Sequence, residues 1–123
     1  MRTELYWVPG VWPGRLAIMP RPRGGDWLED EVQSWRRSGV DVVLSLLTPD
    51  EIDDLSLTAE EELCRANGNE YLSFPISDRG VPPSREAVSM LVTKLAEQLE
   101  DGKNIAVHCR QGIGRAALIA ICL

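Results

Sequence analysis

The sequence predicts a single α/β domain with a central, mostly parallel sheet of about five strands flanked by helices. Three observations lead to this fold class. Short apolar segments alternate with amphipathic helical patterns along the chain, as in folds built on parallel sheets. The segment 41–47 (DVVLSLL) is apolar almost throughout, as expected of a strand buried on both faces. A length of 123 residues suits one domain, residues 1–123, better than two.

Five strands are expected, and turn-forming residues close the first two. The strands cover residues 5–8, 15–19, 41–47, 70–76 and 103–108. Pro9 and Gly10 end the first strand, and the run PRPRGG at 20–25 ends the second. Helical patterns separate the later strands, which favours parallel pairing among them.

Helices are expected between the strands because capping residues stand where helices would begin and end. Asp26 begins the first helix, and Gly39 follows it as a stop. Pro49 opens the second, at the position where its missing N–H costs least. Thr58 opens the third, with Glu61 three residues later in the spacing of a capping box.

The clearest helix covers residues 84–101, because its apolar side chains form one stripe, made of Val88, Leu91, Val92, Leu95 and Leu99. A last helix is expected from Gly114 onward. In parallel sheets, functional sites form beyond the carboxyl ends of the strands, at loops that lead into helices. The loop after the strand 103–108 is therefore the first place to expect a site.

The composition limits the partners of the chain. Thirteen Lys and Arg against nineteen Asp and Glu give a net charge of −6, which disfavours nucleic acids and anionic membranes as partners. The N-terminus lacks a signal-peptide pattern, and the longest apolar run, 116–123, is too short to cross a bilayer. Three cysteines without a close pair predict a reducing, cytoplasmic setting, and a single histidine argues against zinc. We expect a soluble domain with neither metal nor cofactor.

The loop 108–115 reads His-Cys-Arg-Gln-Gly-Ile-Gly-Arg and has the features of a phosphate site. Successive backbone N–H groups in such a turn form an anion nest, and the N-terminus of the next helix adds positive potential. The thiol of Cys109 should ionise readily there, and the planar fork of Arg115 fits two phosphate oxygens. Gly112 and Gly114 permit close approach. The loop is predicted to pair a thiolate nucleophile with a receptor for a phosphate dianion.

This string resembles the signature of the cysteine-dependent protein tyrosine and dual-specificity phosphatases, which is His, Cys, two residues, Gly, two residues, Arg. Residues 14–123 resemble the compact dual-specificity branch, close to the cyclin-dependent-kinase-inhibitor-associated phosphatases. The resemblance implies a tyrosine-phosphatase-like fold. It also implies a hydrolase that removes phosphate from phosphotyrosine, or from phosphoserine and phosphothreonine, in proteins or peptides through a phosphocysteine intermediate.

By the same resemblance, Cys109 is the nucleophile and Arg115 holds the phosphoryl oxygens. His108 looks like the family histidine that supports the loop and tunes the thiolate. The alternative is a core histidine at the end of a strand, and it places the residue in almost the same surroundings. The backbone amides that would bind phosphate belong to Arg110, Gln111, Gly112, Ile113, Gly114 and Arg115.

Asp78 stands just past the strand 70–76 and is the candidate general acid. Family members carry their general-acid aspartate in a similar loop after a strand, which Asp78 matches. A turn-forming aspartate is the alternative. Arg21 and Arg23 follow another strand end, where they could face a phosphorylated substrate or belong to a charged surface loop.

Ala116 departs from the family pattern, which usually has Ser or Thr directly after the arginine. That hydroxyl is thought to ease departure of the cysteine sulfur when water cleaves the phosphocysteine. Its absence allows an alternative function, a module that binds phosphorylated residues with little turnover. A third candidate, a rhodanese-like or arsenate-reducing enzyme, shares a Cys-to-Arg loop but gives no reason for Asp78 or for the spacing of His108 and Gly112.

Two further features bear on redox chemistry and assembly. Cys64 could pair with Cys109 on oxidation, although a buried apolar cysteine on a helix is the stronger expectation. Family domains generally continue past the signature helix, whereas this sequence stops at Leu123. We therefore expect that C-terminal helices are missing and that the apolar face of 117–123 needs a cover, for example by self-association.

The acid and nucleophile assignments predict a bell-shaped pH dependence of hydrolysis of an aryl phosphate, with a mildly acidic optimum. Activity requires Cys109 to be ionised while Asp78 remains protonated. The Asp78→Asn variant should lose about 10²- to 10⁴-fold in rate, measured as kcat on such a substrate. A variant as fast as the wild type would show that Asp78 is not the acid.

Overall fold

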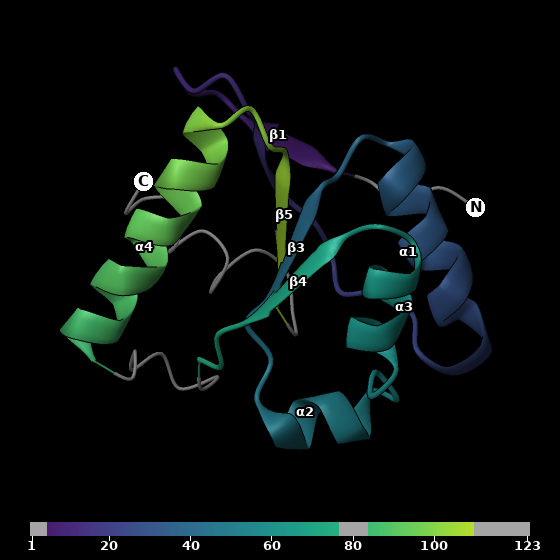
Figure 1. Ribbon diagram of the computed structural model, residues 1–123. Coiled ribbons are helices and arrows are strands. Elements are labelled where there is room, and N and C mark those ends of the chain that lie inside the picture. Colours follow the sequence, from purple (N-terminus) through teal and green to yellow (C-terminus); the bar gives the residue numbers. More distant parts are fainter. Residues whose placement is uncertain (1–4, 77–83, 110–123) are drawn as a thin grey trace.

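The computed structural model describes residues 5–76 and 84–109 of the chain (Figure 1). The strands are β1 (Tyr6–Val8), β2 (Leu16–Ile18), β3 (Val42–Ser45), β4 (Glu70–Ser73) and β5 (Ile105–His108). The helices are the 3-10 turn η1 (Gly25–Trp27), α1 (Leu28–Arg37), α2 (Pro49–Asp54), α3 (Glu60–Ala66) and α4 (Arg85–Glu100). All five expected strands are present, each within or close to its predicted range. The predicted helix from Gly114 and the predicted cover of 117–123 lie outside the described residues.

The five strands form one sheet in the order β1-β2-β5-β3-β4. The β2–β5, β5–β3 and β3–β4 pairs are parallel, and β1 runs antiparallel at the edge. This confirms the predicted α/β fold with a mostly parallel sheet. Because β2, β3, β4 and β5 run the same way, their carboxyl ends meet at one edge of the sheet, the lower one in Figure 1.

Side chains alternate between two apolar layers along the central strand β5. Ile105 and Val107 belong to the layer that packs against α4, which includes Leu95 and Leu99. Ala106 belongs to the opposite layer, which contains the apolar side chains of α1 and α3. Figure 1 shows α4 on one side of the sheet and α1 and α3 on the other. Burial on both faces explains why β3 and β5 are nearly continuous apolar runs.

Two helix starts follow the sequence closely. At α2, the Thr48 side chain accepts a hydrogen bond from the Glu51 backbone N–H, and the Glu51 carboxylate accepts one from the Thr48 N–H, a complete capping box. At α4, the Ser84 side chain accepts a hydrogen bond from the Ala87 N–H at 3.0 Å. The predicted helix 84–101 is confirmed, because α4 covers Arg85–Glu100 with Ser84 as its N-cap and Asp101 as its C-cap.

The starts of the other two helices differ from the predictions. Asp26 does not cap a helix, because it lies within η1, and α1 begins only at Leu28 without a side-chain cap. The capping box predicted at Thr58 is wrong as well, because α3 begins at Glu60, again without a side-chain cap. The Glu61 side chain pairs with Arg65 one helical turn later, at 2.6 Å, instead of reaching back toward Thr58.

The two layers predict a sharp contrast between two residues of α4. Leu99 is fully buried against the sheet, whereas Met90 is 74% exposed. Leu99→Ala should lower the free energy of unfolding by about 2–5 kcal/mol, because it leaves a cavity in the layer. Met90→Ala is the matched control on the same helix, and its change should be about 0.5 kcal/mol or less. Equal losses in urea titrations of the two variants would contradict this packing.

Candidate active site

The central strand β5 delivers two of the predicted site residues to the carboxyl edge of the sheet. Its last residue, His108, pairs in register with Ser45 of β3, and Cys109 follows directly. Cys109 is 1% exposed and belongs to the apolar layer on the α4 face, together with Leu95 and Ile76. His108 contacts residues of α1 and α3, on the opposite face. The side chains of these two neighbouring residues therefore lie on opposite faces of the sheet.

His108 is fixed by a carboxylate that comes from a helix. Its Nε2 lies 2.5 Å from Oε2 of Glu60, the first residue of α3. The two side chains are 0% and 1% exposed. The ring of Trp35 lies beside that of His108, with 6.1 Å between their centroids. A buried charged or polar group needs such a partner, because burial without one is costly.

Glu60 also affects two other titratable groups of the same layer. Burial raises the pKa of the Cys64 thiol to about 12, and the charges of Glu60 and Glu61 act in the same direction. Burial, followed by the charge of Glu60, raises the pKa of Tyr71 well above its ordinary value, although a hydrogen bond with Ser45 opposes this. Both groups therefore stay neutral at physiological pH.

Glu60 is a site residue that sequence reasoning missed. It belongs to an acid-rich stretch, residues 50–62, in which acids near helix starts are normally exposed. The signal that could have found it is helical spacing. Cys64 stands four residues after Glu60, and Leu57 three before it, so all three share the buried face of this segment.

The structure separates the two described cysteines. Cys109 lies in the layer that packs against α4, and Cys64 lies in the layer on the opposite face of the sheet. Both thiols are reduced. The expectation of a buried core cysteine is confirmed for Cys64, and pairing with Cys109 has no support in this geometry because the sheet stands between them.

Asp78, Arg110, Gln111, Gly112, Ile113, Gly114, Arg115 and Ala116 lie outside the described residues. The chain that leads to two of these segments is nevertheless well placed. The Ile76 N–H donates to the carbonyl of Leu46 at 3.0 Å, and the Leu46 N–H donates to the carbonyl of His108 at 3.0 Å. Leu46, the residue that follows β3, thus connects the segment before Asp78 with the strand before the loop 110–115.

Arg23, a candidate substrate contact, is engaged by its own neighbours. Its guanidinium forms an ion pair with Glu31 at 3.0 Å and lies over the ring of Trp27, 4.5 Å from the centroid. Its backbone N–H donates to the same Glu31 carboxylate. These contacts favour the interpretation of a charged surface loop for Arg23.

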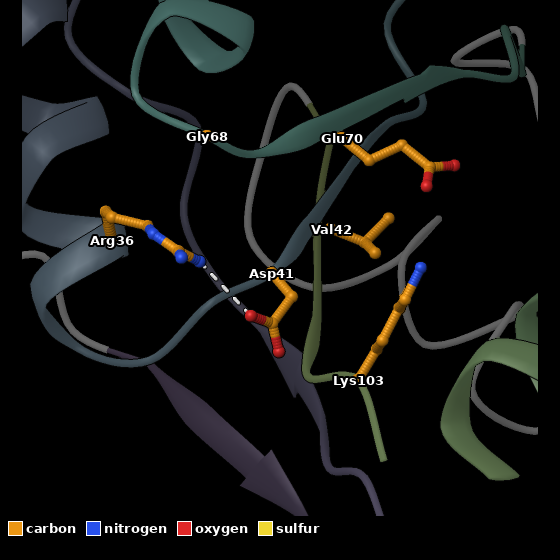
Figure 2. Close-up of a pocket in the computed structure, with 6 residues that line it drawn as sticks. All are labelled: Arg36, Asp41, Val42, Gly68, Glu70 and Lys103. Atoms are coloured by element: carbon orange, nitrogen blue, oxygen red, sulfur yellow. Dashed lines mark hydrogen bonds and ion pairs between the residues drawn. The ribbon is translucent and has the colours of Figure 1, made fainter. Parts of the chain in front are cut away.

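A separate hollow of about 370 Å³ lies at the opposite end of the sheet, where β3 and β4 begin (Figure 2). It is lined by Arg36, Asp41, Val42, Gly68, Glu70 and Lys103. Figure 2 shows Arg36 directed at Asp41, with which it forms an ion pair at 3.1 Å. Glu70 accepts a hydrogen bond from Gln98 and pairs with Lys94. These polar contacts connect side chains near the amino ends of the strands, at the opposite end of the sheet from Cys109.

Within 5–76 and 84–109, no group of three or more His, Cys, Asp or Glu side chains is arranged to hold a metal ion. No helix in these ranges is long and apolar enough to cross a membrane.

Comparisons with known proteins add to this geometry. The model of a family described as "Polymorphic toxin system, DSP-PTPase phosphatase" matches residues 17–123. The 067L protein of Invertebrate iridescent virus 3, which is named as a tyrosine phosphatase, is 36% identical over 55 residues. Those residues are 42% of this chain and 23% of that protein, so the chain matches less than a quarter of the length of this relative.

Solved structures of phosphatases share the fold. A kinase associated phosphatase, with serine in place of its catalytic-site cysteine, superimposes with a TM-score of 0.88 at 17% identity and covers 100% of this chain and 73% of that one. Tk-PTP in its active form gives a TM-score of 0.71 at 27% identity, over 88% of this chain and 65% of that one. These likenesses confirm the expected tyrosine-phosphatase-like fold.

The raised pKa of Cys64 predicts a loss of stability at alkaline pH. The ordinary pKa of the thiol is 9.0, whereas the folded protein raises it to about 12. Above about pH 9 the unfolded chain therefore binds fewer protons than the folded one, and the free energy of unfolding falls as the pH rises. Urea titrations at several pH values between about 8 and 11 would measure this fall.

Cys64→Ala should make the alkaline fall shallower, because the group that titrates is gone. Tyr71→Phe should do the same at higher pH, since the pKa of Tyr71 is also raised from its ordinary value of 10.0. Slopes equal to that of the wild type in both variants would contradict the assignment.

Proposed function

Because this chain belongs to the DSP-PTPase phosphatase family of polymorphic toxin systems, we propose that it hydrolyses phosphotyrosine in proteins through a phosphocysteine intermediate. Phosphoserine and phosphothreonine are further candidate substrates. Membership makes it a protein phosphatase of the tyrosine and dual-specificity type. The observation that carries the finer proposal is the placement of Cys109 at the carboxyl end of the central strand, directly before the signature loop and beside an anchored His108.

In the first step, the Cys109 thiolate attacks phosphorus in line, so that a sulfur–phosphorus bond forms and the bond to the substrate oxygen breaks. Asp78 donates its proton to the departing oxygen. Arg115 and the backbone amides of 110–115 hold the three equatorial oxygens, whose charge they stabilise in the transition state. The tyrosine side chain leaves as a neutral phenol.

In the second step, water attacks the phosphocysteine. The Asp78 carboxylate accepts a proton from that water, the sulfur–phosphorus bond breaks, and the Cys109 thiolate returns as inorganic phosphate leaves. The reaction requires neither a metal nor a redox cofactor. It does require a reduced Cys109, which suits a reducing, cytoplasmic compartment.

The composition of the loop supports a phosphoprotein substrate over a polyphosphorylated lipid or inositol. Relatives that prefer those substrates often carry lysines inside the loop, where this chain has Gln111 and Ile113. The net charge of −6 also weakens attraction to a densely anionic headgroup.

Ala116 is the observation that favours a second function, binding of phosphorylated residues with little turnover. Without a hydroxyl after Arg115, the first step can proceed while release of the Cys109 sulfur in the second step becomes slow. A slow second step would leave the protein trapped as the phosphocysteine.

Rapid-mixing kinetics with p-nitrophenyl phosphate test the proposal. We expect a burst of about one nitrophenolate per protein, followed by slow turnover, because the first step outpaces the second. Ala116→Ser should raise the steady rate and diminish the burst. Cys109→Ser, the control, should abolish both phases.

Absence of a burst in the wild type, with no gain in Ala116→Ser, would remove the assigned role of Ala116. No release of nitrophenolate, combined with tight binding of a phosphotyrosine peptide, would identify a binding module and overturn the proposed hydrolysis.

A further inference from the structure

The contact between Glu60 and His108 links α3 to the residue next to the nucleophile. The two residues are 48 positions apart in the sequence, yet Oε2 of Glu60 lies 2.5 Å from Nε2 of His108. A contact this close between a ring nitrogen and a carboxyl oxygen is a hydrogen bond, and hydrogen bonds to a carboxylate are among the strong ones. Because His108 directly precedes Cys109, a group that fixes the imidazole also acts on the start of the phosphate loop.

Among the groups that surround Glu60 and His108, the imidazole is the one that pairs with the Glu60 carboxylate. Both side chains are buried, and the Trp35 ring packs beside the imidazole. The neighbouring titratable groups, Cys64 and Tyr71, have raised pKa values and stay neutral. Within the described ranges, the His108 imidazole is the only basic group that pairs with the Glu60 carboxylate.

The backbone of α3 holds Glu60 in place. The Glu60 N–H donates to the carbonyl of Leu57 at 3.0 Å, and the Leu57 side chain is itself buried. One turn later, Cys64 packs in the same layer. Anchors on both sides of Glu60 leave its carboxylate little freedom, and a preorganised group of this kind orients its partner without further ordering.

We propose that Glu60 is a positioning residue of the active site, which holds the His108 imidazole in one orientation and thereby fixes the backbone from which Cys109 extends. The inference rests on the proposed role of Cys109 as nucleophile. An imidazole that is free to turn would loosen the start of the loop, and a thiolate is less favoured when the groups around it are not held in place. A carboxylate accepts hydrogen bonds and does not donate them, so the contact with a Glu60 carboxylate is made by a proton on Nε2 of His108.

The test measures ionisation of Cys109 separately from catalysis. The full chain is alkylated with iodoacetamide across a pH series, and peptide masses identify which cysteine has reacted. Glu60→Gln keeps the size and an acceptor oxygen but removes the charge. We expect the midpoint of Cys109 alkylation to move to higher pH by about one unit, with a fall of up to about tenfold in kcat on the acid limb of the pH profile and little change in KM.

Glu61→Gln is the matched control. Glu61 is the next residue of α3, and it pairs with Arg65 at the surface. This variant should keep the wild-type alkylation profile and kcat. Glu60→Asp, which retains the charge, should lie closer to the wild type than Glu60→Gln does.

If Glu60→Gln does not fold, the double variant Glu60→Gln/His108→Asn replaces both partners and avoids a buried unpaired charge. It should show the same alkaline shift. A wild-type alkylation profile in either folded variant would overturn the inference. Failure of the proposed function would look different, because the wild type itself would then release no nitrophenolate while its alkylation profile could still respond to Glu60.

Discussion

The parallel pairing of β5 between β2 and β3 is the constraint on which the rest of the structure depends. A strand with neighbours on both sides has no free edge, so its position and direction are set by two ladders of hydrogen bonds. Both of its faces must then be apolar, which requires helices on each side of the sheet. Cys109, which directly follows β5, therefore has a fixed place in the middle of the row of carboxyl ends of the strands.

In this arrangement, the two apolar layers hold different residues of the candidate site. The thiol of Cys109 lies in the layer against α4, whereas His108 takes its support from α1 and α3. Packing on the α3 face can therefore act on His108 while the surroundings of the Cys109 thiol on the α4 face stay the same. Glu60 is the residue of α3 that contacts His108.

Much of the fold and part of the site could be predicted from the sequence. The apolar runs at β3 and β5 and the stripe on α4 are local patterns, and Thr48 and Ser84 cap helices through contacts within three residues. The starts of α1 and α3 were predicted wrongly, because Asp26 lies within η1 and Glu61 pairs with Arg65 rather than completing a cap. Glu60 was missed because its partner is 48 residues away, and only its helical spacing from Leu57 and Cys64 distinguishes it from the other acids of the stretch.

The backbone of Leu46 connects the two segments that lead to the proposed acid and to the proposed nucleophile. One residue accepts from Ile76 and donates to His108, so the chain before Asp78 and the strand before Arg110 share a single support. A displacement at the end of β3 carries both segments along together and changes their mutual spacing little. Because these are main-chain contacts, the side chain at position 46 can change for packing in the core without altering the spacing between Ile76 and His108.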